Sequence, residues 1–166
     1  SLAFTSKRPG KTQQFNYFAV NDKVNLEKEI KYGDFVPGRR DDDSFYLVDV
    51  PGFGYAEVPE HVRQSWKHFL REYLTSRSTL KVIFHLMDGR HGATAADLEI
   101  VEIASSSTAT YVVVLTKLDK VKQLSETVRR SVYDAVPART PILYTSAERR
   151  RGHDDVWRYL RLAAEG

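Results

Sequence analysis

Two short, almost continuous apolar runs, at 82–87 and 111–115, stand out in the hydropathy pattern of the chain. Runs of this kind are typical of strands that are buried on both faces of a parallel sheet. Segments 45–48 and 141–144 have the same character, and 15–20 predicts a further strand at an edge. The pattern therefore predicts four strands of a parallel sheet and one edge strand.

Between and after these runs, apolar residues recur at the spacing of helices that bury one face. The four stripes consist of Val62, Trp66, Phe69, Tyr73 and Leu74; Leu98, Val101 and Ala104; Leu124, Val128 and Val132; and Val156, Leu160 and Ala163. Thr94 and Asp97 stand at capping-box spacing before the second stripe. Because strand and helix alternate, we expect an α/β domain with a mainly parallel sheet, right-handed crossovers and helices on both faces.

The segment 21–44 does not fit this alternation. It contains an isolated glycine, a Pro-Gly pair, two arginines and a run of three aspartates. Such a composition favours an exposed loop over a strand or a helix. We interpret 21–44 as a surface insertion within a single domain that spans 1–166.

Composition narrows the class of protein. A chain of 166 residues with 42% hydrophobic and 28% charged residues has the size and balance of one globular domain. No apolar run approaches the ~20 residues of a membrane-spanning helix, so we expect no membrane partner. The absence of cysteine excludes disulfides and cysteine-ligated metals. The net charge of +3 is compatible with a nucleic-acid partner.

Polar motifs follow three of the predicted strands, at the position where parallel α/β sheets bind their ligands. The first motif is Asp49-Val50-Pro51-Gly52, a DxxG pattern. An aspartate there can reach a hydrated magnesium ion, and a glycine leaves its N–H free to approach a terminal phosphate. The alternative is a strand that ends in a tight turn.

The second motif is Thr116-Lys117-Leu118-Asp119, a TKxD pattern. The Asp119 carboxylate can accept hydrogen bonds from N1–H and the 2-amino group of guanine, a pair of donors that adenine lacks. At ~1.5–3 kcal/mol for each hydrogen bond to a charged group, the pair can discriminate by several kcal/mol. The stem of Lys117 would cover the face of the ring. The alternative is a polar loop that caps the next helix.

The third motif is Thr145-Ser146-Ala147, whose small residues would let a backbone N–H reach O6 of guanine. Small polar residues end many strands, so this motif alone decides little. The three motifs nevertheless occur in the order and at the strand ends that a guanine-nucleotide site requires. Together they predict such a site.

The segment 7–13 has two interpretations. It contains Gly-Lys-Thr, as a phosphate loop does, but Thr5 stands where the GxxxxGK[ST] pattern requires glycine, and Pro9 removes a backbone donor. We favour a switch loop in which Thr12 reaches the magnesium ion. A degenerate phosphate loop is the alternative.

In these motifs the chain resembles the EngB (YihA) family of ribosome-assembly P-loop GTPases. The resemblance rests on TSKRPGKTQ at 5–13, VDVPGFGYAEVPE at 48–60, DGRHGAT at 88–94 and LTKLDK at 115–120. The Pro-Gly-Lys-Thr-Gln and Pro-Gly-Phe-Gly-Tyr-Ala segments are specific to that family. The similarity extends over nearly the whole chain outside 21–44.

The resemblance implies a P-loop GTPase fold, binding of GTP or GDP with Mg²⁺, GTP hydrolysis, and a role in assembly of the large ribosomal subunit. The residues expected to bind the nucleotide are Gly10, Lys11, Thr12, Gln13, Asp49, Val50, Pro51, Gly52, Thr116, Lys117, Leu118, Asp119, Thr145, Ser146 and Ala147, with Thr12 and Asp49 as metal ligands. The expected partners are the precursor of the large ribosomal subunit, its rRNA, and ribosomal or assembly proteins, rather than DNA or a membrane.

Two departures from the family pattern affect these expectations. The GxxxxGKS phosphate loop, with the strand before it and the helix after it, is absent. We therefore expect the natural protein to have a further N-terminal portion that supplies them; the alternative is a pseudo-GTPase that binds rRNA without nucleotide. The insertion at 21–44 indicates a divergent, organellar relative. We expect a mitochondrial location, with the bacterial cytoplasm or a plastid as alternatives.

The sequence assigns no residue to hydrolysis and offers a set of candidates for partner binding. Phe53 follows Gly52, where some GTPases have a glutamine that orients water, so the catalytic residue stays unassigned and intrinsic hydrolysis should be slow. The basic residues that are candidates for rRNA phosphate contacts are Lys7, Arg8, Lys11, Arg149, Arg150, Arg151, Arg158 and Arg161. A solvated helix face is the alternative for each. A regulatory GTPase that acts on proteins or membranes is a third function class, which no lipidation motif supports.

Overall fold

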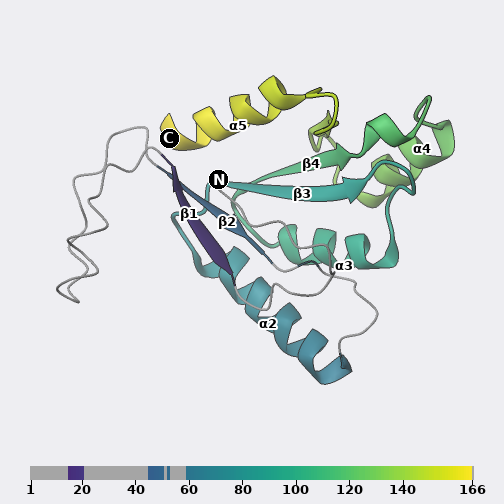
Figure 1. Ribbon diagram of the computed structural model, residues 1–166. Helices are drawn as coiled ribbons and strands as arrows, with labels where there is room; N and C mark the ends of the chain where they lie inside the picture. Colours follow the sequence, from purple (N-terminus) through teal and green to yellow (C-terminus); the bar gives the residue numbers. More distant parts are fainter. Residues whose placement is uncertain (1–14, 21–44, 51, 53–58, 166) are drawn as a thin grey trace. The chain divides into compact units, whose positions relative to one another are not determined.

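The computed structural model of the chain describes residues 15–20, 45–50, 52 and 59–165 (Figure 1). These residues belong to two compact units. The first contains strands β1 and β2, and the second runs from helix α2 to helix α5. None of the helices in these ranges is long and apolar enough to cross a membrane.

The first unit is a pair of strands. β1 (Asn16–Val20) pairs with β2 (Phe45–Asp49) in antiparallel fashion, with Asn16 opposite Asp49 and Val20 opposite Phe45. Both strands were predicted, but the expectation that β2 is a buried strand of the parallel sheet is wrong for the described residues. Strands that follow one another in the sequence commonly pair with each other, and this pair is antiparallel. The interpretation of 21–44 as an insertion concerns residues outside the described ranges.

The second unit contains a parallel sheet of three strands in the order β3-β4-β5. β3 (Val82–Asp88) pairs with β4 (Thr110–Thr116) along its whole length, and β4 pairs with β5 (Ile142–Tyr144). The strands predicted at 82–87, 111–115 and 141–144 are therefore confirmed. Because the strands are parallel, their carboxyl ends lie along one edge of the sheet, which is where the TKxD and Thr-Ser-Ala motifs follow β4 and β5. The DxxG motif instead follows β2, in the first unit.

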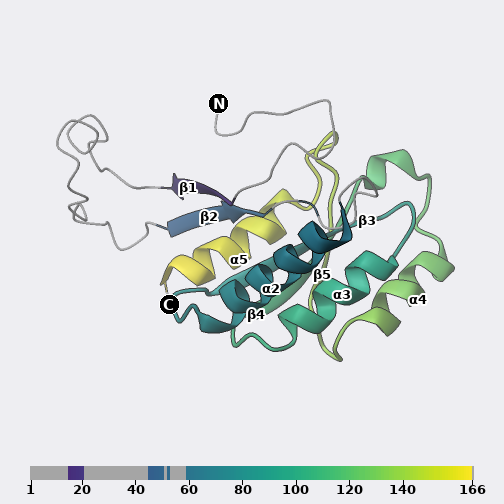
Figure 2. The same cartoon turned by 90° about the horizontal axis from the view of Figure 1, so that it is seen from below.

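Helices cover both faces of this sheet, as the alternating pattern predicted (Figures 1 and 2). The helices are α2 (Glu60–Ser76), α3 (Ala95–Ala104), α4 (Glu126–Ala135) and α5 (His153–Glu165), and a short 3₁₀ helix, η1, spans Leu118–Lys120. The ring of Phe84 packs edge-on against Tyr159 of α5 at 6.5 Å, whereas its neighbour His85 contacts α3. Successive side chains of a strand point to opposite faces, so α5 and α3 lie on opposite sides.

One part of the core of the second unit lies between the sheet, α3 and α4. Met87, Val113, Leu115 and Val132 form one cluster in which no side chain is more than 1% exposed. On the opposite face of β4, Val112 is fully buried as well. Burial on both faces explains why the sequence of β4 is an unbroken apolar run.

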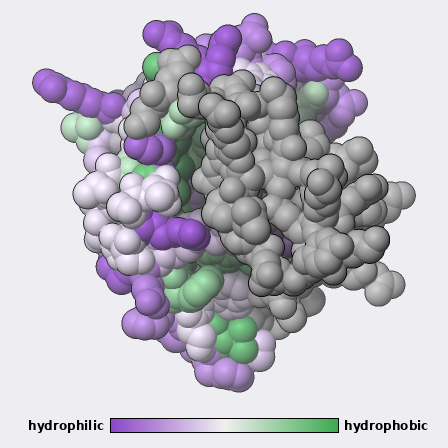
Figure 3. Space-filling model, turned by 90° about the vertical axis from the view of Figure 1, so that its left-hand side faces the viewer, coloured by the Kyte–Doolittle hydropathy of each residue, from purple (hydrophilic) through white to green (hydrophobic). Residues whose placement is uncertain are grey.

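Two of the predicted apolar stripes do not match the buried faces. Leu98 is 51% exposed and Phe69 is 48% exposed, although both were expected in the core. In α3 the neighbouring residue Asp97 is directed at His85, and this contact sets the rotation of the helix. In α2 the buried residues are Leu70 and Leu74. On the face shown in Figure 3, hydrophobic residues accordingly lie in separate groups between hydrophilic ones.

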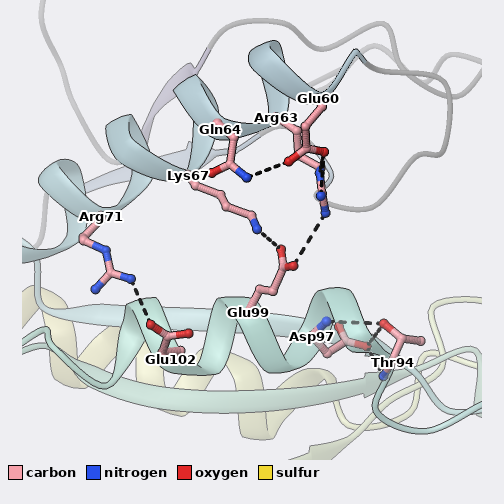
Figure 4. A network of polar contacts seen from close by, with 9 residues as sticks. All are labelled: Glu60, Arg63, Gln64, Lys67, Arg71, Thr94, Asp97, Glu99 and Glu102. Carbon is pink, nitrogen blue, oxygen red and sulfur yellow. Dashed lines mark hydrogen bonds and ion pairs between the residues drawn. The ribbon is translucent and has the colours of Figure 1, made fainter.

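Ion pairs join α2 to α3 (Figure 4). Glu99 of α3 lies 2.7 Å from Lys67 Nζ and 3.5 Å from Arg63 Nη1, and Arg71 lies 3.2 Å from Glu102. Exposed pairs of this kind contribute ~0–1 kcal/mol each. They therefore contribute little to the stability of the fold.

A buried polar network connects β3, β4 and α3. His85 Nδ1 lies 2.7 Å from the Tyr111 hydroxyl, and His85 Nε2 lies 3.0 Å from Asp97 Oδ1. Asp97 also accepts hydrogen bonds from the backbone and the side chain of Thr94, both at 2.7 Å. The Asp97 backbone N–H donates to Thr94 Oγ1 at 3.3 Å, which completes the predicted capping box. Burial alone would raise the pKa of the Asp97 carboxyl, but the hydrogen bonds from His85 and Thr94 hold it below its usual range.

This network should make the stability of the protein sensitive to acid. A carboxylate whose pKa is lowered by folding stabilises the fold above its ordinary pKa of ~4, and this contribution is lost as the pH falls further. Asp97→Asn should therefore reduce the free energy of unfolding by about 1–3 kcal/mol at neutral pH, because asparagine has one acceptor oxygen in place of the two that His85 and Thr94 use.

Thermal unfolding followed by circular dichroism at a series of pH values tests this expectation. The difference between parent and variant should shrink below pH ~4. Asp134→Asn is the matched control, since Asp134 is exposed on α4 and forms no ion pair or side-chain hydrogen bond within the described residues. A constant difference at every pH would contradict the assigned role of the Asp97 charge.

Candidate functional site

The chain reverses direction directly after β4, at the carboxyl edge of the sheet. Lys117 adopts the left-handed conformation, with φ 59° and ψ 30°, and η1 follows it. This turn brings Leu118 N to 3.3 Å from the carbonyl oxygen of Thr145, at the end of β5. Thr145 in turn donates its backbone N–H to the carbonyl of Leu115 at 2.8 Å. The loops after β4 and β5 are thus joined through the backbone.

The carboxylate of Asp119 is held at this junction. Ser146 Oγ donates a hydrogen bond to Asp119 Oδ1 at 2.7 Å, and Lys120 Nζ lies 3.3 Å from Oδ2. The hydrogen bond from Ser146 is the main cause of a lowered pKa of this carboxyl, with a smaller effect of Lys120. Asp119 is therefore ionised at neutral pH, and its orientation is set before any ligand binds.

Ser146 belongs to a tight turn that follows β5. Its backbone forms an antiparallel bridge with Arg151, with N···O distances of 3.1 and 3.0 Å. Its hydroxyl also accepts a hydrogen bond from the backbone N–H of Arg149 at 3.1 Å. Gly152 closes the turn at φ 73°, where an added Cβ would collide with the carbonyl oxygen of Tyr144. The Ser146 hydroxyl thus has a donor role toward Asp119 and an acceptor role toward the turn.

Lys117 is oriented by an aspartate that the sequence did not single out. Lys117 Nζ lies 3.0 Å from Asp88 Oδ2, and Arg90 donates to the same carboxylate through Nε at 2.9 Å and Nη2 at 2.7 Å. The hydrogen bond from Arg90, supported by Lys117, holds the pKa of the Asp88 carboxyl well below its usual range. A signal was present in the sequence, since Asp88 begins the DGRHGAT segment directly after the apolar run at 82–87.

Most of the predicted base-binding residues are brought together here. Leu118 contacts Thr145 through the backbone, Asp119 contacts Ser146, and Thr116 Oγ1 donates to the carbonyl of Met87 on β3 at 3.1 Å. Ala147 follows in the same turn and is exposed. Asp49, Val50 and Gly52 belong to the unit of β1 and β2, while Gly10, Lys11, Thr12, Gln13, Pro51 and Phe53 lie outside the described residues.

Asp49 has the chemistry that the predicted magnesium site needs. Mg²⁺ prefers oxygen ligands, keeps several of its waters and commonly takes only one or two carboxylates from a protein. Asp49 supplies such an oxygen at the end of β2, and the other predicted ligand, Thr12, lies outside the described residues. Within the described ranges, no group of three or more histidine or acidic side chains forms a metal site on its own.

The arrangement is suited to recognition of a planar base with two adjacent donors. A carboxylate has about four acceptor positions, and Ser146 occupies one of those on Asp119 Oδ1. The remaining positions can accept from two N–H groups of one base edge. The aliphatic stem of Lys117, anchored at its end by Asp88, can lie against the ring.

A protein-family model matches the larger part of the chain. The model described as "50S ribosome-binding GTPase" matches residues 1–117. The match includes the DxxG motif and the first two residues of the TKxD motif. It ends before Asp119 and the turn after β5.

Similar proteins come from several bacteria. The chain is 36% identical over 160 residues to the probable GTP-binding protein EngB of Bartonella bacilliformis, with 93% of this chain and 69% of that protein covered. It is 39% identical over 160 residues to the protein of the same name from Cereibacter sphaeroides, with 92% and 63% covered. For the Brucella melitensis protein, the covered share of the relative is 61%. The chain therefore spans less than two thirds of the length of several of its relatives.

Solved structures share the fold. A probable GTP-binding protein EngB superposes with a TM-score of 0.60 at 18% identity, over 72% of this chain and 74% of that one. Era, in a complex with MgGDPNP and nucleotides 1506–1542 of 16S ribosomal RNA, gives a TM-score of 0.54 at 19% identity, over 78% and 42%. The fold of the chain is thus that of a P-loop GTPase, as the sequence predicted.

The loops of this site should be sensitive to the volume of residue 89. A Cβ on Gly89 would lie 2.5 Å from Leu118 Cδ2 and 2.8 Å from the carbonyl oxygen of Thr116. Gly89→Ala should therefore lower the free energy of unfolding by about 1–3 kcal/mol, measured by denaturant titration. Combined with Leu118→Ala, which removes one of the two clashes, the losses should be less than additive. Strict additivity would show that the two side chains do not meet.

Proposed function

Because the chain belongs to the EngB family of GTP-binding proteins, we propose that it binds GTP and GDP and that the whole protein hydrolyses GTP to GDP and phosphate. The observation that carries the proposal is the carboxylate of Asp119, which Ser146 holds at 2.7 Å beside the ends of β4 and β5. A fixed, ionised acceptor at that edge suits the N1–H and 2-amino donors of guanine.

Selectivity for guanine follows from the charge of Asp119. Each hydrogen bond to a charged acceptor contributes ~1.5–3 kcal/mol, and adenine offers no matching pair of donors. A buried acceptor left without a partner opposes binding of the wrong base in addition. Loss of both bonds therefore corresponds to a change in affinity of about a hundredfold or more.

The proposal extends to the phosphates and the metal. Thr12 and Asp49 are the proposed magnesium ligands, and the segment 7–13 is the proposed switch loop. Magnesium would neutralise phosphate charge and order that loop. No residue of the chain is assigned to activation of the attacking water.

We further propose a role in assembly of the large ribosomal subunit. Its support is the description of the matching family as 50S ribosome-binding, and the basic residues that follow β5. The proposed partners are the precursor of the large subunit, its rRNA, and ribosomal or assembly proteins. Co-sedimentation of the full-length protein with large-subunit precursors, with GTP or GDP present, tests this part.

Asp119→Asn should change the preferred base. The amide of asparagine donates where the carboxylate accepts, which suits the 2-oxo group of xanthine. In the full-length protein, the variant should lose at least about a hundredfold in affinity for GDP while its affinity for XDP rises above that for GDP. Fluorescent nucleotide analogues provide the measurement.

Asp134→Asn is again the matched control and should leave both affinities unchanged. Thermal unfolding of the Asp119 variant separates a specific effect from loss of fold, since an asparagine oxygen can still accept from Ser146. GDP affinity equal to that of the parent would refute guanine recognition by Asp119.

Asp88→Asn should weaken binding without changing the choice of base. The substitution removes the ion pair that orients Lys117, and partly exposed pairs contribute ~0.2–1 kcal/mol, so GDP affinity should fall about two- to fivefold. The ratio of GDP to XDP affinity should stay as in the parent, since Asp119 is intact. Lys117→Ala should cause the larger loss. If Asp88→Asn has no effect in a folded protein, Asp88 does not position Lys117.

A further inference from the structure

Three consecutive arginines, Arg149, Arg150 and Arg151, form the tip of the turn that follows β5. We refer to them as the arginine turn. All three are exposed, although the backbone that carries them is well defined by the bridge between Ser146 and Arg151. Arg150 is held at φ 49°, and Gly152 at φ 73° ends the turn. The positive charges are therefore presented on a shaped loop.

The charges of the arginine turn are not neutralised within the described residues. None of the three guanidinium groups forms an ion pair there, and that of Arg149 only approaches the backbone carbonyl of Asp119, at 3.5 Å. Glu148 precedes them in the sequence and forms no ion pair within the described ranges either. Guanidinium groups with free donors are well suited to phosphate oxygens.

The exposed side of α5 carries further arginines, together with the exposed carboxylates of Asp154 and Asp155 in its first turn. Arg158 and Arg161 are exposed there. Trp157, which precedes Arg158 in the sequence, is 39% exposed. The Trp157 indole donates to His153 Nε2 at 2.9 Å, which orients the ring. An oriented aromatic ring among arginines suits an unpaired base next to a phosphate backbone.

The arginine turn is also connected to the proposed base site. The hydroxyl of Ser146 accepts the backbone N–H of Arg149 at 3.1 Å and donates to Asp119 Oδ1 at 2.7 Å. A displacement of Arg149 changes the position of this hydroxyl. The orientation of the carboxylate that receives the base then changes with it.

We propose that the arginine turn and the exposed side of α5 bind the phosphate backbone of single-stranded RNA, and that this contact alters guanine-nucleotide affinity through Ser146. The coupling rests on the proposed function, since it acts on the same base site. RNA is favoured over a protein partner because unpaired arginines and an exposed indole match phosphates and stacked bases. By thermodynamic reciprocity, the nucleotide changes RNA affinity by the same factor.

Binding of a fluorescein-labelled oligouridylate to the full-length protein tests the surface. The double variant Arg150→Gln/Arg151→Gln should bind more weakly and reduce the slope of log K against log salt by about 1.4, that is ~0.7 for each lost phosphate contact. Trp157→Ala should weaken binding with no change in slope, since it removes stacking alone.

Lys122→Gln/Arg130→Gln is the matched control, because both residues are exposed and lack ion pairs within the described part of the chain. It removes the same charge from a different surface and should leave the affinity unchanged. Equal losses in the control and in the double variant would overturn the surface, as would unchanged binding by the double variant. Equally tight binding of oligothymidylate would overturn the assignment to RNA.

Nucleotide affinity, measured with and without saturating oligouridylate, tests the coupling. The parent should show different affinities for GDP in the two conditions, and Arg150→Gln/Arg151→Gln should show a smaller difference at an oligouridylate concentration that just saturates the parent. Ser146→Ala should keep RNA binding but lose the difference. If all three proteins respond equally to RNA, the connection through Ser146 is wrong. A parent that binds no guanine nucleotide would overturn the proposed function and the coupling together, while the oligouridylate measurement still decides the surface.

Discussion

The parallel register of β3 and β4 is the constraint on which the candidate site depends. It sets Asp88 opposite Thr116, so that the residues following each strand emerge side by side. The core cluster around Met87, Leu115 and Val132 holds this register, because a slip of one residue would turn each buried side chain to the other face. The polar side chains at the carboxyl edge of the sheet are therefore positioned by the packing of apolar side chains in the core.

The site itself is organised by pairs of groups that hold one another. Asp88 holds Lys117, and Ser146 holds Asp119. Each of the two side chains proposed to contact the base thus has a partner within the protein. Such support lowers the entropy that binding must overcome, since the rotamers are selected during folding. In the interior, His85 and Asp97 likewise orient each other through a hydrogen bond.

The sequence predicted the parts of this protein that follow from local pattern. The runs around Val113 and Phe84 indicated buried strands, and the meeting of the TKxD and Thr-Ser-Ala motifs followed because parallel strands end at one edge. The partner of β2 was not predictable, since a short apolar run carries no information on the direction of pairing. The pairing of Asp88 with Lys117 spans 29 residues, and no periodicity reports such a contact. Leu98 was misplaced because the contact of Asp97 with His85, a tertiary interaction, set the rotation of α3.

The backbone conformation of Lys117 has a consequence for which residues this position tolerates. A non-glycine residue in the left-handed region is strained by on the order of 1 kcal/mol, and β-branched residues are strained more. Glycine or asparagine would relieve the strain but would remove the long stem and the amine that meets Asp88. Stability and ligand binding therefore make opposite demands on residue 117. Selection for stability alone would therefore favour replacement of Lys117. The resulting variant would be more stable but would bind the ligand more weakly.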